Sequence, residues 1–166
     1  MDTGNTNAIP DYSALRIIWT SKIQSIKEVI KQCEIGLNRQ ESIHSLVTST
    51  FIKLVSHKVI LEGSALIKMR EDFEETRVLM EKVTKLLKSM KKAKGQAQDE
   101  LEFISSHISQ RDCRSEMQEI QNLIDMLDTM SSLIFETLHQ LNNALTGIEE
   151  QVYALVETYS SSDLDE

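Results

Sequence analysis

The sequence predicts an all-α protein whose long amphipathic helices form an elongated coiled coil or a helical bundle. The 166-residue chain has a single proline, Pro10, so no proline interrupts a helix downstream of it. It has five glycines and 5 % aromatic residues, which disfavours tight hairpins and a core anchored by aromatic side chains. Its aliphatic residues recur at alternating steps of three and four, the spacing of a coiled-coil seam.

The N-terminal part of the sequence predicts a disordered segment followed by a helix. Residues 1–11 are rich in Asn, Thr and Gly, and we expect a disordered lead. Asp11 or Ser13 is placed to cap the helical segment 12–94. Its first seam, which loosens near Gly36, consists of Trp19, Ile23, Ile26, Ile30, Cys33 and Leu37. Residues 42–52 are rich in Ser, Thr and β-branched side chains, but the helical spacing on both sides predicts that the helix continues.

The clearest pattern is a coiled-coil seam over residues 52–90, which step strictly by three and four. The apolar positions that we expect to contact a partner helix are Val55, Val59, Leu66, Met69, Phe73, Met80, Val83, Leu87 and Met90. Glu62 and Thr76 interrupt the seam. They are candidates for fixing the helix register and the choice of partner, or they lie at a seam edge where the Glu62 carboxylate reaches water.

The C-terminal part predicts a break and a second seam. Residues 95–115 are expected to form a hinge and a short helix, because Gly95 lies in a polar run and Ser115 begins a capping-box spacing. A coiled-coil helix follows over 116–159, with one doubled step of four. Its partner-facing positions are Leu123, Leu127, Met130, Ile134, Leu138, Leu141, Leu145, Ile148, Val152 and Leu155. We expect residues 160–166 to form an exposed acidic tail.

The charge balance and the absence of chemical motifs narrow the function. The net charge of −8 is unsuited to neutralising phosphates, so we do not expect a nucleic-acid partner. No nucleophile, phosphate-loop or metal-ligand motif is present, and we expect no enzyme activity, cofactor, metal or small-molecule substrate. The basic run Lys82–Lys94 follows an acidic stretch at residues 71–75. It predicts a solvated face with local ion pairs, or a site for anionic lipid or an acidic partner.

The same sequence predicts a cytoplasmic protein. No stretch approaches about 18 uninterrupted apolar residues, the length that spans a membrane. The N-terminal residues lack the basic start and apolar core of a signal peptide. Cys33 and Cys113 are too isolated for a disulfide framework, so we expect two reduced thiols.

Two short segments resemble a known family. Residues 148–155 (IEEQVYAL) look like a segment near the end of a small helical subunit of the biogenesis-of-lysosome-related-organelles complex. Residues 123–130 (LIDMLDTM) resemble a stretch in the coiled coil of dysbindin, another subunit of that assembly. The resemblance implies a cytoplasmic subunit of an elongated hetero-oligomer in endosomal sorting and vesicle trafficking. It also implies peripheral association with endosomal or lysosomal membranes through the complex.

These observations leave more than one function open. The first is a non-catalytic coiled-coil subunit whose two seams are buried against helices of other subunits. The second is a self-contained helical bundle, a binding or tethering module in which helices 52–90 and 120–159 fold antiparallel. A spindle or kinetochore subunit would carry the same seams. A SNARE-like fusion protein is disfavoured because the C-terminal seam lacks a central polar layer.

Overall fold

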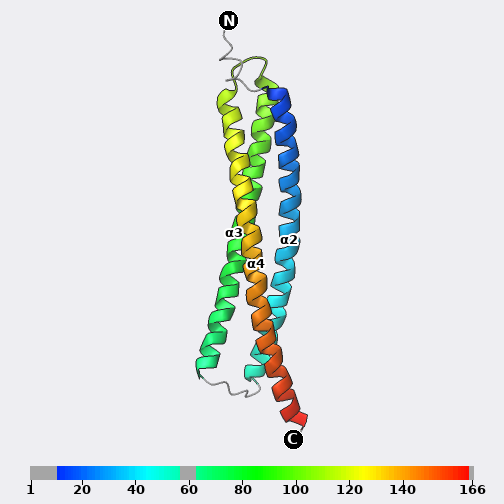
Figure 1. Cartoon of the computed structure of the whole chain (residues 1–166), viewed down its shortest axis with the longest axis vertical. Helices are drawn as coiled ribbons and strands as arrows, with labels where there is room; N and C mark the ends of the chain where they lie inside the picture. Colours follow the sequence, from blue (N-terminus) through cyan, green and yellow to red (C-terminus); the bar gives the residue numbers. More distant parts are fainter. Residues whose placement is uncertain (1–10, 57–62, 165–166) are drawn as a thin grey trace. The chain divides into compact units, whose positions relative to one another are not determined.

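The computed structural model describes residues 11–56 and 63–164, with side chains over 11–56 and 65–158. Within these ranges the chain forms three α-helices and no strand (Figure 1). The helices are α2 (Tyr12–Ser56), α3 (Gly63–His107) and α4 (Arg114–Leu164). The protein is therefore an all-α helical bundle, which confirms the predicted fold class.

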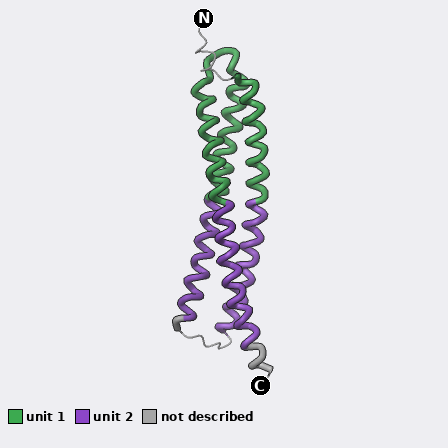
Figure 2. The backbone as a smooth tube through the Cα atoms, viewed as in Figure 1, with its two compact units in different colours: residues 1–32, 86–134 green, residues 33–85, 135–166 purple. Residues whose placement is uncertain are grey.

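The three helices contribute to two compact units, which we describe separately (Figure 2). Unit 1 comprises Met1–Gln32 and Leu86–Ile134, and so holds the beginning of α2, the end of α3 and the beginning of α4. Unit 2 comprises Cys33–Lys85 and Phe135–Glu166, which supply the remaining part of each helix. Each unit buries its own apolar side chains between helices, because one amphipathic helix cannot cover its apolar stripe alone.

In unit 1, the predicted seam of α2 forms part of the core. Its buried side chains are Trp19, Ile23, Ile26 and Ile30. The Trp19 Nε1–H donates a hydrogen bond of 3.1 Å to Oε1 of Gln121, which joins the beginning of α2 to the beginning of α4. The Tyr12 hydroxyl lies 3.3 Å from the carbonyl oxygen of Leu101 near the end of α3. In this unit α2 and α4 therefore run in the same direction, and α3 runs against them.

Unit 2 has a core in which all three helices take part. Its buried cluster consists of Val47, Phe51, Met69, Ile148 and Val152. The Phe51 and Phe73 rings lie 5.2 Å apart between centroids, a distance typical of favourable aromatic pairs. The Gln40 side-chain amide donates to Asn142 Oδ1 over 3.1 Å. These contacts hold segments distant in sequence together. Residues 42–52 lie inside α2 and are helical, as the sequence predicts.

Carboxylates satisfy the first backbone N–H groups of two helices. The Ser13 backbone N–H donates to Asp11 Oδ1 at the start of α2 over 3.0 Å, as the sequence predicts. At the start of α4, the Arg114 N–H donates to Asp112 Oδ1 over 3.0 Å. The helix begins at Arg114, as expected for a restart near Ser115, but Asp112 supplies the capping oxygen instead of the predicted Ser115 box.

The turn between α3 and α4 contains neither Gly nor Pro and is held by side chains. Arg111 bonds the Glu116 carboxylate over 3.0 Å, and its guanidinium lies 5.4 Å from the Phe103 ring centroid. The Phe103 ring also stacks on His107 at 4.2 Å between centroids. A cation–π contact and a charge-assisted hydrogen bond thus close the turn. Glycine positions in the sequence do not predict a turn of this kind.

The predicted continuous seam over 52–90 is wrong, because α2 ends at Ser56 and α3 begins at Gly63. Ile52 and Val55 therefore lie on α2, where they are exposed. Positions from Leu66 onward lie on α3. Spacing by three and four identifies the apolar face of a helix. It does not distinguish one continuous helix from two helices that bury the same kind of face.

The predicted hinge over 95–115 is also wrong in its first part, since α3 runs without a break to His107. Ala93 and Ala97, on either side of Gly95, are buried in unit 1. Their packing outweighs the cost of an interior glycine, about 1 kcal/mol. At the other end, α4 extends to Leu164 and so into the predicted tail. Residues 1–10 and 165–166 lie outside the described residues.

Candidate interaction surface

The structure places most of the predicted partner-facing positions in the cores of the two units. The buried positions are Met69, Val83, Leu87, Met90, Leu123, Leu127, Ile134, Leu141, Leu145, Ile148 and Val152. The half-buried positions are Leu66, Phe73, Met80, Met130, Leu138 and Leu155. Val55 is exposed, and Val59 lies outside the described residues. In this conformation the chain's own helices cover the seams, so these side chains are not free to receive a partner helix.

Of the two candidates for fixing the helix register, the structure describes Thr76 but not Glu62. Thr76 is fully buried, and its hydroxyl donates to the Phe73 carbonyl oxygen of the same helix over 2.7 Å. A hydroxyl satisfied in this way makes no demand on a second helix, so the structure gives Thr76 a local role. Glu62 lies outside the described residues.

The beginning of α2 exposes apolar residues that lie outside the predicted seams. Ile17 is 72 % exposed and Ile18 is 53 % exposed. Ile17 lies two positions before the buried Trp19, a rotation of about 200° around a helix, so it faces away from the core. The signal was present in the sequence as two consecutive isoleucines outside the seam, but a count of seam positions ignores them.

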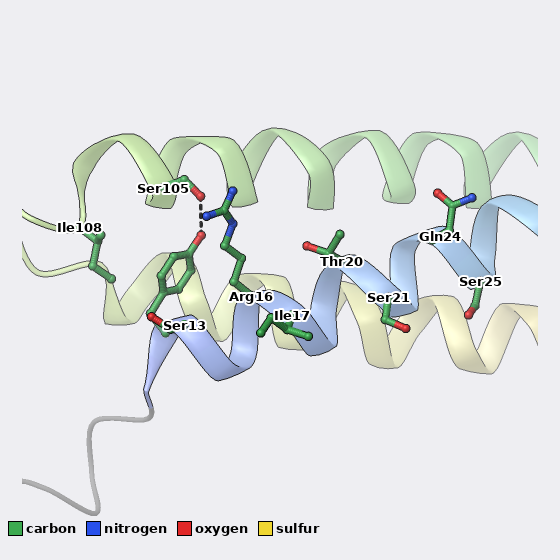
Figure 3. Close-up of a pocket in the computed structure, with 10 residues that line it drawn as sticks. Ser13, Arg16, Ile17, Thr20, Ser21, Gln24, Ser25, Ser105 and Ile108 are labelled. Carbon is green, nitrogen blue, oxygen red and sulfur yellow. Dashed lines mark hydrogen bonds between the residues drawn. The ribbon is translucent and has the colours of Figure 1, made fainter.

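A groove lies beside Ile17, between α2 and the C-terminal end of α3 in unit 1 (Figure 3). Its volume is about 1000 Å³. A hydrogen bond of 2.6 Å between Tyr12 Oη and Ser105 Oγ closes one end. The lining residues are Tyr12, Ser13, Arg16, Ile17, Thr20, Ser21, Gln24, Ser25, Ser105 and Ile108. Arg16 carries the one charge in this lining, and the other polar groups are hydroxyls and one amide, none of them activated by a neighbouring base.

A second groove, of about 550 Å³, lies between α2 and α4 in the same unit. Ile17, Ser21 and Ser25 line both grooves, while Ile18 lines the second. We call these four residues the outer face of α2. At the far side of the second groove, Lys22 Nζ pairs with Asp128 over 3.2 Å. The outer face is uncharged and has a depression on each side.

Unit 2 has a smaller groove of about 530 Å³ along α2, lined by His44, Thr48 and Ile52 among others. Within the described part of the chain, His44 Nε2 and Thr48 Oγ1 are buried and have no hydrogen-bond partner. Burial lowers the pKa of His44, and the Phe73 backbone raises it to a smaller extent. The ring also lies edge-on to Phe73, at 6.1 Å between centroids. A pKa lowered below its ordinary value keeps this imidazole mainly neutral at pH 7.

Two cysteines and one glutamate are the other groups whose burial matters for their chemistry. Burial raises the pKa of the Cys33 thiol, and Cys33 and Cys113 are both free and buried, so neither is an exposed nucleophile. Burial and the nearby Glu119 and Glu116 raise the pKa of the Glu100 carboxyl. Among the described residues, no group of three or more His, Cys, Asp or Glu side chains is arranged to hold a metal ion.

Comparison with protein-family models, with curated proteins and with solved structures finds no match to this chain. In the part of the chain that the structure describes, no helix is both long and apolar enough to cross a membrane. The fold and its surface therefore define the class: a helical bundle with an uncharged, partly apolar helix face open to solvent.

Proposed function

We propose that the protein is a non-catalytic helical subunit that binds another helical protein through the outer face of α2. The observation that carries this proposal is the exposure of Ile17 and Ile18, at 72 % and 53 %. The helix that bears them already has a complete buried seam on its other side. Burying an isoleucine side chain contributes about 1.5–3 kcal/mol, so covering both would drive association.

The shape of this surface supports a helix as the partner. Helices pack when the side-chain ridges of one lie in the grooves of the other. Here depressions of about 1000 and 550 Å³ flank the outer face. Ser21 and Ser25 are small and one turn apart, which permits close approach of a second backbone. A partner helix with an apolar stripe would bury Ile17 and Ile18, while Arg16 and the Lys22–Asp128 pair would lie at its sides in the two depressions.

We infer further that the assembly belongs to endosomal or lysosomal trafficking, with the protein in the cytoplasm and on membranes only through its complex. The support for this finer proposal is the resemblance of residues 123–130 and 148–155 to subunits of the biogenesis-of-lysosome-related-organelles complex. A spindle or kinetochore assembly is the alternative. The identity of the bound partner distinguishes the two.

The test compares two double variants in affinity purification from the native cell, followed by calorimetric titration of the purified partner. Ile17→Ser/Ile18→Ser removes the apolar side chains of the outer face. Leu46→Ser/Ile67→Ser is the matched control, because these residues are 58 % and 59 % exposed in unit 2. We expect a helical protein to co-purify stoichiometrically with the wild type and the control. The Ile17/Ile18 variant should weaken its binding by about tenfold or more.

Circular dichroism should show the same helix content and the same melting temperature for all three chains, because the substituted side chains are exposed. The proposal is rejected if the Ile17/Ile18 variant retains the partner with unchanged affinity. It is also rejected if no stoichiometric helical partner is found.

A further inference from the structure

The groove between α2 and α3 in unit 1 continues along both helices into a region whose charge the proposed function does not use. The α2 part of its lining falls between Tyr12 and Ser25, and the α3 part is Ser105 and Ile108 (Figure 3). The two helices run in opposite directions in this unit, as the hydrogen bond between Tyr12 and Ser105 shows. The groove is therefore continued by later residues of α2 and by earlier residues of α3.

On α2, two lysines lie on the continuation of the groove. Residues two heptads apart lie on nearly the same side of a helix. Lys27 lies two heptads after Ser13, and Lys31 lies two heptads after Ile17. Ser13 and Ile17 line the groove, so both lysines follow its α2 side. Both are exposed and belong to unit 1.

The same spacing applies to α3. Lys91 lies two heptads before Ser105, and Lys94 lies two heptads before Ile108. Both lysines belong to unit 1, where Lys91 is exposed and Lys94 is half-buried. Two helices thus bring lysines to the same end of one groove. We call these residues the basic end of the groove: Lys27, Lys31, Lys91 and Lys94.

The surroundings of the basic end are basic as well, although the chain as a whole has a net charge of −8. Residues 12–32 of α2 and 86–98 of α3 contain eight Lys or Arg and one acidic residue, Glu28. The acidic residues of α3 within unit 1 begin at Asp99, nearer the turn to α4. The sign of the charge is therefore locally reversed beside a groove that is otherwise polar and apolar.

We propose that the helix that covers the outer face of α2 is an acidic amphipathic helix, whose apolar stripe contacts Ile17 and Ile18 and whose acidic segment lies along the basic end. This inference rests on the proposed function and adds the chemistry of the partner. Among the described residues no ion pair to Lys27 or Lys31 is found, so their charges are available to a partner. Opposite charges across an interface steer the encounter and fix the register of the two helices.

The shape of the surface favours a helix over an anionic membrane. A rod in a groove between two helices meets lysines from both sides, whereas a flat bilayer meets only the outermost side chains. Proteins that lie on a membrane also insert large apolar and aromatic side chains into it. The described aromatic residues of unit 1 are Tyr12, Trp19 and Phe103, and all three are buried or half-buried.

Two synthetic helical peptides of about 20 residues, and so about 30 Å long, test the proposal. Both carry the same stripe of leucines at alternating steps of three and four. The acidic peptide has glutamates beside the stripe in one half, and the basic peptide has lysines at the same positions. Each is labelled with fluorescein and titrated with the full chain by fluorescence anisotropy, at about 0.05 M and about 0.5 M NaCl, where charges are screened to different extents.

We expect the acidic peptide to bind about tenfold or more tightly than the basic peptide at low salt, and the difference to shrink at high salt. The net charge of −8 would by itself favour the basic peptide. A preference for the acidic peptide therefore reports on the local charge of the basic end.

Lys27→Glu/Lys31→Glu should weaken binding of the acidic peptide by about tenfold or more and remove the preference. Arg39→Glu/Lys53→Glu is the matched control, because it makes the same change of net charge at exposed positions of α2 in unit 2. The control should bind both peptides with affinities close to those of the wild type. Circular dichroism should show equal helix content for all chains, since the substituted side chains are exposed.

The proposal is overturned if the two peptides bind equally, if neither binds at low salt, or if the Lys27/Lys31 variant keeps the preference. It is also overturned if the wild type ignores the acidic peptide but binds phosphatidylserine–phosphatidylcholine vesicles through these lysines, which would assign the basic end to a membrane. Equal binding of both peptides that is lost in Ile17→Ser/Ile18→Ser would overturn only the acidic chemistry and leave the proposed function in place. Binding of the acidic peptide that Ile17→Ser/Ile18→Ser leaves unchanged would overturn both, because that helix would then not contact the outer face.

Discussion

Replacing Leu127 with alanine tests whether the chain buries its own C-terminal seam. Leu127 lies on α4 in unit 1 and is fully buried. Removing its side chain loses the transfer free energy of the deleted carbons and leaves a cavity that the neighbouring side chains fill only in part. At a fully buried leucine this costs about 3–4 kcal/mol of the free energy of unfolding. If a partner helix covered the seam instead, Leu127→Ala would lower the free energy of unfolding of the isolated chain only slightly.

Ile17→Ala is the matched control, because it also shortens an aliphatic side chain in unit 1 but at a position that is 72 % exposed. Its free energy of unfolding should change by less than about 0.5 kcal/mol. Leu127 and Ile17 therefore differ in burial, and the difference between the two variants measures how well the chain's own helices cover the seam.

The assay is urea unfolding followed by tryptophan fluorescence. Trp19 is the one tryptophan of the chain and is buried in unit 1, so its emission reports on that unit. With a denaturant slope of about 1–3 kcal/mol per molar, a loss of about 3–4 kcal/mol should place the Leu127→Ala midpoint about 1–4 M below that of the wild type. The reasoning is refuted if Leu127→Ala costs less than about 1 kcal/mol, or no more than Ile17→Ala.

Two other substitutions follow from local features. Gly95→Ala should raise the free energy of unfolding by up to about 1 kcal/mol in urea titrations, because Gly95 is inside α3 and a Cβ there would meet nothing within 4 Å. A loss of stability would contradict a continuous helix. His44 has a lowered pKa, so below its ordinary value of 6.5 the unfolded chain binds the proton more readily and stability falls. The melting temperature of His44→Gln should therefore change less between pH 7.5 and pH 5 than that of the wild type. Equal slopes would show that His44 is not held neutral by the fold.

The spacing of apolar residues was sufficient to predict which face of each helix is buried. The α2 seam from Trp19 to Leu37 and the α4 seam from Leu123 to Val152 were predicted, and their members are buried or half-buried. This succeeded because a helix places residues three and four apart on one side, and burial of apolar surface is the main favourable term in folding. The cap at Asp11 was predictable for a similarly local reason, since its side chain bonds a backbone N–H two residues away.

The positions of the helix ends were harder to predict from the sequence. Each depends on the balance between the local free-energy cost of a residue in a helix and the packing of that segment against other helices. Gly95 has the local character of a hinge, yet Ala93 and Ala97 are buried in unit 1 and the helix continues. The turn after His107 depends on Arg111, which reaches both Phe103 and Glu116. The spacing of apolar residues reveals neither the packing of Ala93 and Ala97 nor the contacts of Arg111.

Local spacing thus established that the chain is helical and which side of each helix is apolar. Which helix covers which side came from the packed structure, because apolar attraction has no direction and a stripe accepts its own chain or another equally well. The assignment of Leu127 and Ile148 to the interior, and of Ile17 and Ile18 to the solvent, became possible only when the three helices were seen packed together in each unit.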